Sequence, residues 1–374
     1  MMSDGSFARE HGRVVSLVLA GGIALGMYEA GAYAALHEHP ELHPHWLAGS
    51  SIGAVTAALI AGNPPERRVA RLREFWEATD PFPTMSSWLA PFSTGAFRQA
   101  QNGASAAQTI LFGRPGLFRP RLAPGFQRGA QDVPALFDVG PMARRLSELV
   151  DFDLLNSGAV RLAISCTDVM SGERVVFDTG HGDRIEAQHV LASCALLPLF
   201  APIEVAGRLL ADGCLGANTP LDLVLGENDR RDALCFVVEL FARQGSRPHS
   251  LAASASRAGD LAFGNQTRRI LEGLQRERRL RGLLGKLAAQ LPDEVRHDPA
   301  VEAILAEGRT GRATVASIAY RGGLDEAGML KPFDFSRATL ADRWAAGDEA
   351  MRHAIAAVNE VPHDHDGALT VIDG

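Results

Sequence analysis

The stretch LAGGIALGMYEAGAYAAL, residues 19–36, is compatible with three different structures. Two arginines precede it, and an apolar run followed by small residues is the pattern of a secretory signal peptide. Its single charged residue is Glu29, so the stretch also resembles a membrane span. The third possibility is a buried strand, a glycine turn and a helix, and the choice among the three decides the fold.

The residues on either side favour the third possibility. The preceding run Val14–Leu19 (VVSLVL) is rich in β-branched residues and ends at Ala20-Gly21-Gly22, which is typical of a buried strand and a tight turn. Residues 27–38 then alternate small and large side chains at helical spacing and stop before Pro40. We therefore expect neither a cleaved signal peptide nor a transmembrane helix.

Composition limits the classes of function. The 374 residues suffice for one large domain or two ordinary ones. A hydrophobic fraction of 46% and a charged fraction of 22% are those of a soluble globular protein. The net charge of −7 provides no basic field for nucleic acid, so we expect no nucleic-acid partner.

The cysteines and histidines give little sign of a metal site. The cysteines lie in apolar or small-residue runs without CxxC spacing, which indicates reduced core thiols and a cytoplasmic protein. Histidines crowd residues 37–45, but the prolines there break any single face, so a solvated loop is favoured over a metal site. We predict no metal and no cofactor. The residues concerned are Cys166, Cys194, Cys214 and Cys235, and His37, His39, His43 and His45.

Strand and helix patterns alternate along most of the chain. Helices are expected near residues 54–61, 66–77, 139–150 and 265–290, and further strands at 160–166, 174–177, 233–240 and 314–320. Residues 185–220 predict a short helix, a proline-marked loop and a turn. This alternation predicts an α/β fold with a mostly parallel sheet covered on both faces.

Residues 80–135 differ from the rest of the chain. They are rich in proline and phenylalanine and have no firm periodicity. Because the phenylalanines argue against plain disorder, we predict a mobile apolar cap. The phenylalanines are Phe82, Phe92, Phe97, Phe112, Phe118 and Phe126.

The sequence Gly49-Ser50-Ser51-Ile52-Gly53 matches the G-x-S-x-G nucleophile elbow. The motif alone is weak, but the apolar run before it and the helical pattern after it supply the strand, turn and helix that the elbow requires. Ser51 is therefore the candidate nucleophile, and Gly49 and Gly53 leave room for its sharp turn. The alternative is a tight turn with an incidental serine.

A serine nucleophile needs a stabilised oxyanion and a base. The segment Gly21-Gly22-Ile23 lies between a strand and a helix, where backbone N–H groups are unpaired and the helix dipole is positive. For the base, Asp212 follows an apolar run and precedes Gly213. An Asp-Gly pair is either a turn or a catalytic site, and the local sequence leaves both possibilities open.

Taken together, these motifs resemble the patatin-like phospholipase family. That family combines a glycine-rich oxyanion loop, a G-x-S-x-G elbow and an Asp-Gly motif, and it uses a Ser–Asp dyad without histidine. The resemblance extends over residues 14–222 and includes LASCALLPLFAPIEV (191–205) and ADGCLGANTPL (211–221). It implies a three-layer α/β/α fold, Ser51 as nucleophile, Asp212 as base, and a lipid or acyl ester substrate.

Two residues depart from the pattern of the family. Its oxyanion loop commonly has glycine and arginine where this chain has Ile23 and Leu25. A β-branched residue does not adopt positive φ cheaply, so we expect an ordinary backbone at Ile23. Without the arginine, the loop lacks a cation that would steer anionic head groups. This difference weakens the assignment as a phospholipase more than the assignment as an ester hydrolase.

The resemblance leads to a division of the chain and to three hypotheses for its function. We expect a flexible N-terminus (1–13), a catalytic core (14–222) that contains the cap, and a C-terminal extension (223–374) that completes the sheet. The first hypothesis is a serine acyl hydrolase with a Ser51–Asp212 dyad. The second is a conventional triad with a later histidine such as His249 or His353, and the third is an inactive lipid-binding relative.

Contact with a membrane surface is a further expectation. The helix at 265–290 alternates arginines with leucines, as a basic amphipathic helix on anionic lipid does. A surface helix with its leucines on the core explains the same pattern, and the glycines in it favour that explanation. The phenylalanine-rich cap (80–135) is the better candidate for lipid contact, because acyl chains need an apolar approach.

Overall fold

The opening stretch folds as a strand, a short turn and a helix. In the computed structural model, β1 (Arg13–Leu19) is followed by the 3-10 turn η1 (Ile23–Leu25) and by α1 (Gly26–His37). Glu29 is fully buried in α1, where its carboxyl accepts a hydrogen bond from Thr56 Oγ1 at 3.1 Å. Burial raises the pKa of Glu29 well above its ordinary value, although the hydrogen bond from Thr56 acts in the opposite direction. The prediction of strand, turn and helix is confirmed.

The structure describes residues 13–77, 95–121, 133–226, 231–245, 247–308, 311–322, 328–360 and 369–373. Residues 1–12 of the expected N-terminal segment lie outside them, as do residues 80–94 and 122–132 of the expected cap. Phe82, Phe92 and Phe126 fall in these ranges.

One large sheet organises the described residues. Its strands follow the order β11-β10-β9-β1-β2-β5-β8-β7, and β6 also pairs with β5. The pairs from β11 to β5 are parallel, whereas β5 pairs antiparallel with β6 and β8. The expected mostly parallel α/β sheet is thus confirmed. Besides β1, the strands of this sheet are β2 (Trp46–Ser50), β5 (Arg161–Asp168), β6 (Arg174–Asp178), β7 (Ile203–Val205), β8 (Arg208–Asp212), β9 (Asp232–Glu239), β10 (Ala313–Ala319) and β11 (Leu369–Asp373), and a separate antiparallel pair is formed by β3 (Arg119–Pro120) and β4 (Phe137–Asp138).

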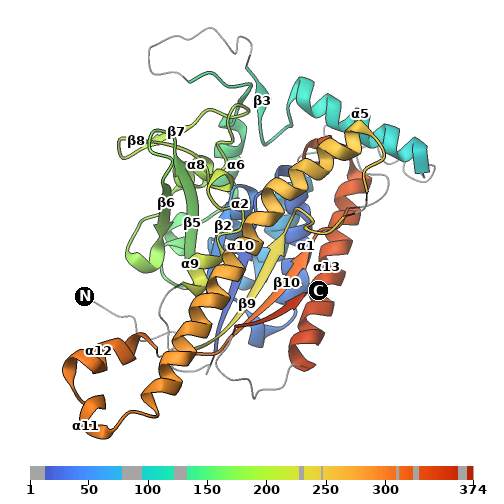
Figure 1. Cartoon of the computed structure of the whole chain (residues 1–374). Coiled ribbons are helices and arrows are strands. Elements are labelled where there is room, and N and C mark those ends of the chain that lie inside the picture. Colours follow the sequence, from blue (N-terminus) through green and yellow to red (C-terminus); the bar gives the residue numbers. More distant parts are fainter. Residues whose placement is uncertain are drawn as a thin grey trace.

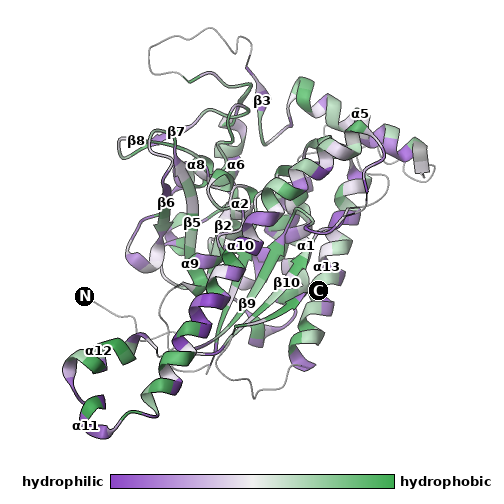
Figure 2. Ribbon diagram, viewed as in Figure 1, coloured by the Kyte–Doolittle hydropathy of each residue, from purple (hydrophilic) through white to green (hydrophobic). Residues whose placement is uncertain are grey.

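Helices cover both faces of this sheet (Figure 1). Side chains alternate along β1: Leu17 and Leu19 join the core that α1 and α2 cover, while Val18 joins the core under α10. The hydrophobic strands stand out between helices of mixed colour in Figure 2. Besides α1 and η1, the helices are η2 (Pro40–Leu42), α2 (Ile52–Ala61), α3 (Pro65–Glu77), α5 (Gly95–Phe112), α6 (Gly140–Leu149), α7 (Phe152–Leu155), η4 (Thr179–His181), α8 (Ala187–Ser193), η5 (Gly213–Leu215), α9 (Leu221–Leu225), α10 (Leu251–Ala288), α11 (Asp293–Arg296), α12 (Pro299–Glu307), η6 (Gly328–Phe333) and α13 (Arg337–Glu360).

Two local expectations are wrong. The β7–β8 hairpin replaces part of the loop expected in 185–220, and its turn has positive φ at Ala206 (50°) and Gly207 (77°). Such a turn usually carries Asn-Gly, so Ala-Gly gave no signal. In the cap, α5 is regular helix where no periodicity was found. Phe97 and Phe112 of α5 are exposed, so this helix does not show the apolar stripe of a core helix.

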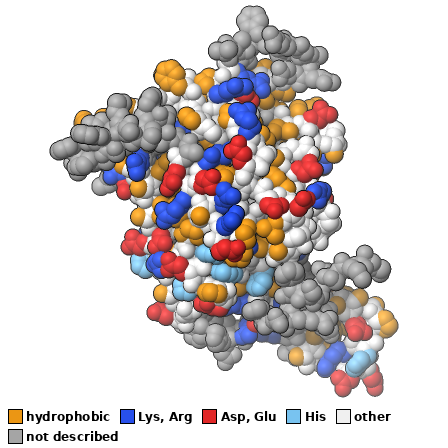
Figure 3. Space-filling model, turned by 180° about the vertical axis from the view of Figure 1, so that it is seen from behind, with side chains coloured by type: hydrophobic (Ala, Val, Ile, Leu, Met, Phe, Trp, Pro, Cys, Tyr) orange, Lys and Arg blue, Asp and Glu red, His pale blue; other side chains and the backbone are white. Residues whose placement is uncertain are grey.

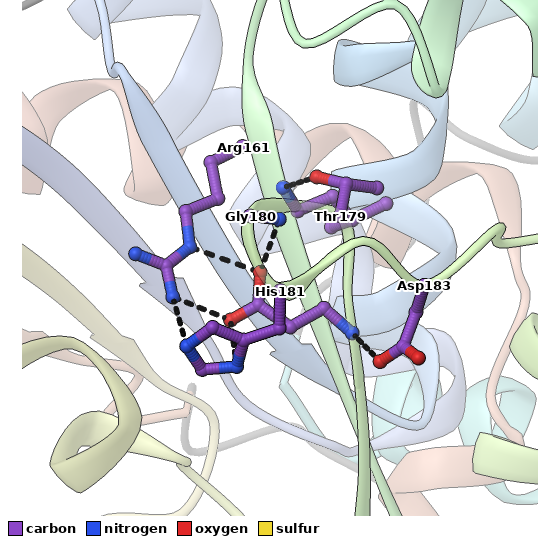
Figure 4. A network of polar contacts seen from close by, with 7 residues as sticks. Arg161, Thr179, Gly180, His181 and Asp183 are labelled. Carbon is purple, nitrogen blue, oxygen red and sulfur yellow. Dashed lines mark hydrogen bonds and ion pairs between the residues drawn. The ribbon is translucent and has the colours of Figure 1, made fainter. Parts of the chain in front are cut away.

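A polar network fixes β5 against β6 (Figure 4). Arg161 donates from Nε to Asp178 Oδ1 at 2.9 Å and from a terminal nitrogen to Asp178 Oδ2 at 2.8 Å. The same Oδ1 accepts the N–H of Gly180 at 2.8 Å, and the Arg161 guanidinium lies 3.6 Å from the Trp46 ring centroid. Two parallel hydrogen bonds to one carboxylate fix the orientation of the Arg161 and Asp178 side chains as well as their distance. The network therefore holds β5 and β6 in their observed register.

The surface shows no dominance of one charge sign on the face seen in Figure 3, where acidic and basic side chains are interspersed. On α10, Leu271 and Leu274 are buried, whereas Leu280, Leu283 and Leu287 are more than half exposed. The expectation that the leucines of this helix face the core therefore holds for its middle and is wrong for its end. Among the described helices, none combines the length and apolarity of a membrane span.

Two glycines bring α1 and α13 into backbone contact. A Cβ added to Gly347 would lie 2.0 Å from the carbonyl oxygen of Tyr28, and one added to Gly31 would lie 2.0 Å from that of Trp344. We expect Gly347→Ala to lower the free energy of unfolding by about 1–3 kcal/mol, because the helices must separate. Denaturant titration measures this change.

A matched control for that substitution lies in α10. Gly273 is exposed and has open space around the position of a Cβ. Gly273→Ala should therefore raise the free energy of unfolding by up to about 1 kcal/mol, the difference in helix propensity. Equal stability changes for the two variants would contradict the close helix contact.

Candidate active site

Ser51 stands at the turn between β2 and α2. Its backbone has φ 55° and ψ −126°, a strained conformation for a residue other than glycine. The N-terminus of α2 begins at the next residue, so the positive end of the helix dipole lies beside the hydroxyl. The backbone N–H of Ser51 donates to Ser193 Oγ at 2.9 Å. A strained turn that presents a serine at a helix start is the geometry of a nucleophile elbow.

Both flanking glycines are required by close approach. A Cβ on Gly49 would lie 2.5 Å from the carbonyl carbon of Gly53, and a Cβ on Gly53 would lie 2.4 Å from the carbonyl oxygen of Leu19. Neither glycine has positive φ, so space rather than backbone freedom selects glycine at both positions.

The structure brings Asp212 to Ser51 from the end of β8. Ser51 Oγ donates a hydrogen bond to Asp212 Oδ2 at 2.7 Å, and the two residues are 161 positions apart in the chain. The carboxyl is completely buried, while Ser51 is 7% exposed. The other carboxyl oxygen, Oδ1, accepts the N–H of Cys214 at 2.8 Å. Hydrogen bonds therefore orient the carboxyl at both of its oxygens.

The surroundings of Asp212 make it a stronger base than an ordinary aspartate. Burial raises the pKa of Asp212 from 3.8 to about 6, although hydrogen bonds from Cys214 and Ser51 act in the opposite direction. Burial, and then the charge of Asp212, raise the pKa of Cys166 and of Cys194 as well. These buried cysteines are thus neutral thiols, and they give the carboxylate a weakly polar environment.

The glycine after Asp212 has a steric reason. A Cβ on Gly213 would lie 2.1 Å from the carbonyl oxygen of Ser165, and its φ is not positive. Asp212 itself caps the turn η5 while it accepts from Ser51. The aspartate thus forms the turn and also contacts the serine, so the turn does not exclude the catalytic interpretation.

The glycine loop lies beside Ser51. A Cβ on Gly21 would lie 2.9 Å from Ser51 Cβ, so glycine is needed there for the approach. The N–H of Gly21, however, donates to both the carbonyl oxygen and Oδ1 of Asn218, each at 3.1 Å. This corrects the expectation that Gly21 is an oxyanion donor. Within the described part of the chain, the N–H groups of Gly22 and Ile23 have no acceptor.

Ile23 contradicts the expectation of an ordinary backbone, because its φ is 52°. Positive φ is a genuine outlier for a β-branched residue and costs on the order of 1–3 kcal/mol. Such strain persists only where the surrounding structure over-determines the conformation. Tertiary contacts to η1 have therefore overridden the local preference of isoleucine.

The sequence assigned no role to two residues that support the site, although Asn218 belongs to the segment that resembles the Asp-Gly motif of the family. Ser193 accepts the N–H of Ser51 and donates from Oγ to the carbonyl of Ser165 at 2.7 Å. Asn218 holds Gly21 as described above. The bonds from Ser51 to Ser193 and from Gly21 to Asn218 join residues that are 142 and 197 positions apart, so no local pattern predicts these contacts.

A pocket of about 170 Å³ opens over Ser51 and the glycine loop. Its wall is mostly apolar and includes Leu196, Leu199, Phe241, Phe263, Met329 and Phe333. Lys331 also lines this wall, and its Nζ pairs with Oδ1 of the buried Asp260 at 2.7 Å. An apolar pocket with few polar groups is suited to an acyl chain.

The histidines lie elsewhere in the structure. His249 and His353 are exposed, and no hydrogen bond joins a histidine to Ser51 or Asp212 in the described ranges. His37 and His43 stack with ring centroids 4.8 Å apart. Over those same ranges, no cluster of three or more His, Cys, Asp or Glu side chains is arranged to hold a metal ion.

Comparison with known proteins identifies the family. A family model described as patatin-like phospholipase matches residues 17–225, more than half of the chain, and one described as patatin phospholipase matches residues 261–365. No curated protein matches the chain in sequence.

Solved structures of several phospholipases and effectors are similar to this chain. VipD from Legionella pneumophila is 16% identical, with a TM-score of 0.36 over 93% of this chain and 75% of VipD. The type III effector ExoU is 14% identical, with a TM-score of 0.38 over 93% of this chain and 54% of ExoU. Human GIVD cytosolic phospholipase A2 is 14% identical, with a TM-score of 0.39 over 95% of this chain and 62% of that protein. The chain thus spans less than two thirds of the length of the last two.

The resemblance noted from the motifs agrees with these family matches, which cover both the elbow and the Asp-Gly segment. The chain belongs to the patatin-like phospholipase family of lipid acyl hydrolases.

Proposed function

We propose that the protein hydrolyses acyl esters through a Ser51–Asp212 dyad and an acyl-enzyme intermediate. The observation that carries this proposal is the 2.7 Å hydrogen bond from Ser51 Oγ to the buried carboxylate of Asp212, at the base of an apolar pocket. Nucleophile and base must lie within hydrogen-bond reach, and this pair does.

In the first half of the reaction, Ser51 Oγ attacks the ester carbonyl while its proton passes to Asp212. The tetrahedral oxyanion accepts hydrogen bonds from the N–H groups of Gly22 and Ile23, which are otherwise unpaired in the described structure. The C–O bond to the alcohol then breaks, and Asp212 returns the proton to the leaving oxygen. The acyl group remains on Ser51.

In the second half, water replaces the alcohol. Asp212 takes a proton from the water as its oxygen attacks the acyl carbonyl, and the same N–H groups stabilise the second oxyanion. Collapse of this intermediate breaks the bond to Ser51 Oγ, which recovers its proton from Asp212, and the fatty acid leaves. One carboxyl thus serves as base and acid in both halves.

The raised pKa of Asp212 predicts the pH dependence. The base is the ionised carboxylate, so activity is lost as pH falls through about 6 and is constant above it. Below that point we expect kcat/KM to fall about tenfold per pH unit. The pH profile, measured at two temperatures, checks this. A carboxyl ionises with little enthalpy, so its inflection should not move, whereas an inflection that shifts as imidazole does would contradict the dyad.

The two other hypotheses make different predictions. A conventional triad requires one histidine, so either His249→Ala or His353→Ala would abolish activity under that hypothesis. Because both side chains are exposed, we expect each variant to keep activity within about twofold of the unmodified protein. An inactive relative would fail to react with a fluorophosphonate although the protein is folded.

The apolar pocket indicates that the substrate carries an acyl chain, and several classes of ester meet this condition. Phospholipids, lysophospholipids, glycerides and short polyesters all present an acyl ester to Ser51. Hydrolysis rates for a matrix of acyl-chain lengths and head groups identify the class. A preference for short, water-soluble acyl groups over long ones would contradict a lipid substrate.

Contact with a lipid surface is part of the proposal. On α5, Phe97, Leu111 and Phe112 are each more than half exposed, and this helix packs against η6, which contributes residues to the pocket. Exposed aromatic and aliphatic side chains insert into the interfacial region of bilayers. We expect Leu111→Ser/Phe112→Ser to weaken co-sedimentation with lipid vesicles while hydrolysis of a soluble ester is unchanged. Loss of both together would contradict a surface role.

A further inference from the structure

We propose that Arg343 is a positioning residue that polarises and fixes the oxyanion loop through a chain of hydrogen bonds ending at the N–H of Ile23. Arg343 belongs to α13, more than 280 residues after the elbow, and is completely buried. This inference rests on the proposed function, because it assigns Arg343 a part in stabilising the oxyanion formed at Ser51.

The guanidinium binds the loop and the pocket wall at once. One terminal nitrogen donates to the carbonyl oxygen of Ala24 at 3.1 Å and to that of Asp334 at 3.0 Å. The other donates to the carbonyl oxygen of Lys331 at 2.9 Å. Ala24 is the centre of η1, and Lys331 lines the pocket over Ser51. One fixed fork therefore joins the oxyanion loop to the segment opposite it.

The bond to Ala24 continues through two peptide groups. The carbonyl of Ala24 shares its peptide with the N–H of Leu25, which donates to the carbonyl oxygen of Gly22 at 3.1 Å. That carbonyl in turn shares its peptide with the N–H of Ile23. In a trans peptide the C=O and N–H point in opposite directions, so the N–H of Ile23 points away from the turn. The chain thus runs from the guanidinium to Ala24, Leu25, Gly22 and Ile23.

This arrangement has an electrostatic consequence. Hydrogen bonds in series polarise one another, and a charged donor at one end strengthens every bond that follows. The positive charge of Arg343, which is hydrogen-bonded to the carbonyl of Ala24, therefore makes the N–H of Ile23 a better donor to a developing oxyanion. The loop has no cation of its own, since residue 25 is leucine.

The strain at Ile23 supports the same role. Its φ of 52° persists only where contacts from other parts of the chain hold the turn. Arg343 makes such a contact, with the carbonyl of the next residue, Ala24. A buried charge costs free energy unless it is hydrogen-bonded, and three carbonyls bond this one. A movement of the loop would break one of these bonds, so the guanidinium holds the loop in one conformation. The loop is then ready before the oxyanion forms, as electrostatic stabilisation requires.

The test separates positioning from stability. We expect Arg343→Met to lower kcat by about 10- to 100-fold and to leave KM unchanged, since the oxyanion exists only in the transition state. The rate of inactivation by a fluorophosphonate should fall by a similar factor. Arg343→Lys keeps the charge but cannot form the fork, so its kcat should lie between those of Arg343→Met and the unmodified protein.

Arg278 provides the matched control. It is also a buried arginine, 8% exposed, and it donates to the carbonyl oxygen of Gly311 at 2.9 Å from α10. Arg278→Met should lower stability to a comparable extent and leave kcat unchanged. An equal loss of kcat in both variants, or a loss that follows the folded fraction, would overturn the inference.

A second variant decides the matter where Arg343→Met does not fold. Replacing the N–H of Leu25 by an ester oxygen, with an α-hydroxy acid at this position, breaks the chain and leaves Arg343 in place. The expected result is the same loss of kcat at constant KM, and an unchanged kcat would overturn the inference. Failure of the unmodified protein to hydrolyse any ester would instead refute the proposed function.

Discussion

Ser51→Ala should abolish ester hydrolysis, with kcat lower by about 10⁶, the loss seen when a serine nucleophile is removed from a comparable unit. The reason is chemical, because alanine offers no oxygen for the acyl-enzyme. The fold should persist, since the side chain is small and the N–H that donates to Ser193 remains. Circular dichroism and a denaturant titration check the fold, and a long-chain ester assay checks the activity.

Ser50 is the matched control for this variant. It precedes Ser51 and is completely buried, and its hydroxyl has no hydrogen-bond partner among the residues that the structure describes. Removing an unpaired buried hydroxyl costs little, so Ser50→Ala should keep both activity and stability. Activity that survives in Ser51→Ala, or is lost equally in Ser50→Ala, would contradict Ser51 as the nucleophile.

Asp212→Asn should lower kcat by at least about 10⁴, the loss that the same change causes at the triad aspartate of a serine protease, where the aspartate only orients the base. Asparagine has the same shape and can still accept the N–H of Cys214, but its amide does not take the proton of Ser51. Because a neutral amide replaces a buried charge, the free energy of unfolding should stay the same or rise. The assay compares kcat and stability in the same preparation.

A nearby aspartate gives the control for Asp212. Asp222 of α9 pairs with Arg174 in a partly exposed ion pair, with a nitrogen–oxygen distance of 2.6 Å. Exposed pairs contribute at most about 1 kcal/mol, so Asp222→Asn should leave kcat within about twofold. Retention of more than a tenth of the activity in Asp212→Asn would exclude its role as base.

The elbow and the positions of the main strands along the chain could be predicted because their signals are local. The glycines at 49 and 53 are required by contacts within a single turn and by the adjacent strand, so they appear as a short motif. The buried parallel strands are continuous apolar runs, which the chain shows without any knowledge of their partners.

The features that could not be predicted depend on distant residues. The positive φ of Ile23 is imposed by the tertiary structure around η1, including Arg343, which is 319 residues from Ala24. The N–H of Gly21 is taken by Asn218, 197 residues away, so the donor set of the loop could not be read from the loop itself. In both cases the local sequence indicates only a conformational preference, and tertiary contacts determine the conformation and the hydrogen bonds that form.

Residues from the N-terminal and C-terminal parts of the chain line the pocket together. Phe241, Phe263 and Phe333 lie outside the segment that matches the patatin-like phospholipase family at residues 17–225, yet they line the pocket over Ser51. The acyl-chain preference is therefore expected to depend on the C-terminal part of the chain as well as on the segment that contains Ser51.

Fluorophosphonate labelling followed by peptide mass spectrometry tests the Ser51–Asp212 dyad most directly. The dyad predicts one phosphonyl adduct, on Ser51, which forms at an unchanged rate in His249→Ala and His353→Ala and at a strongly reduced rate in Asp212→Asn. An adduct on a different residue, or none on folded protein, would contradict it.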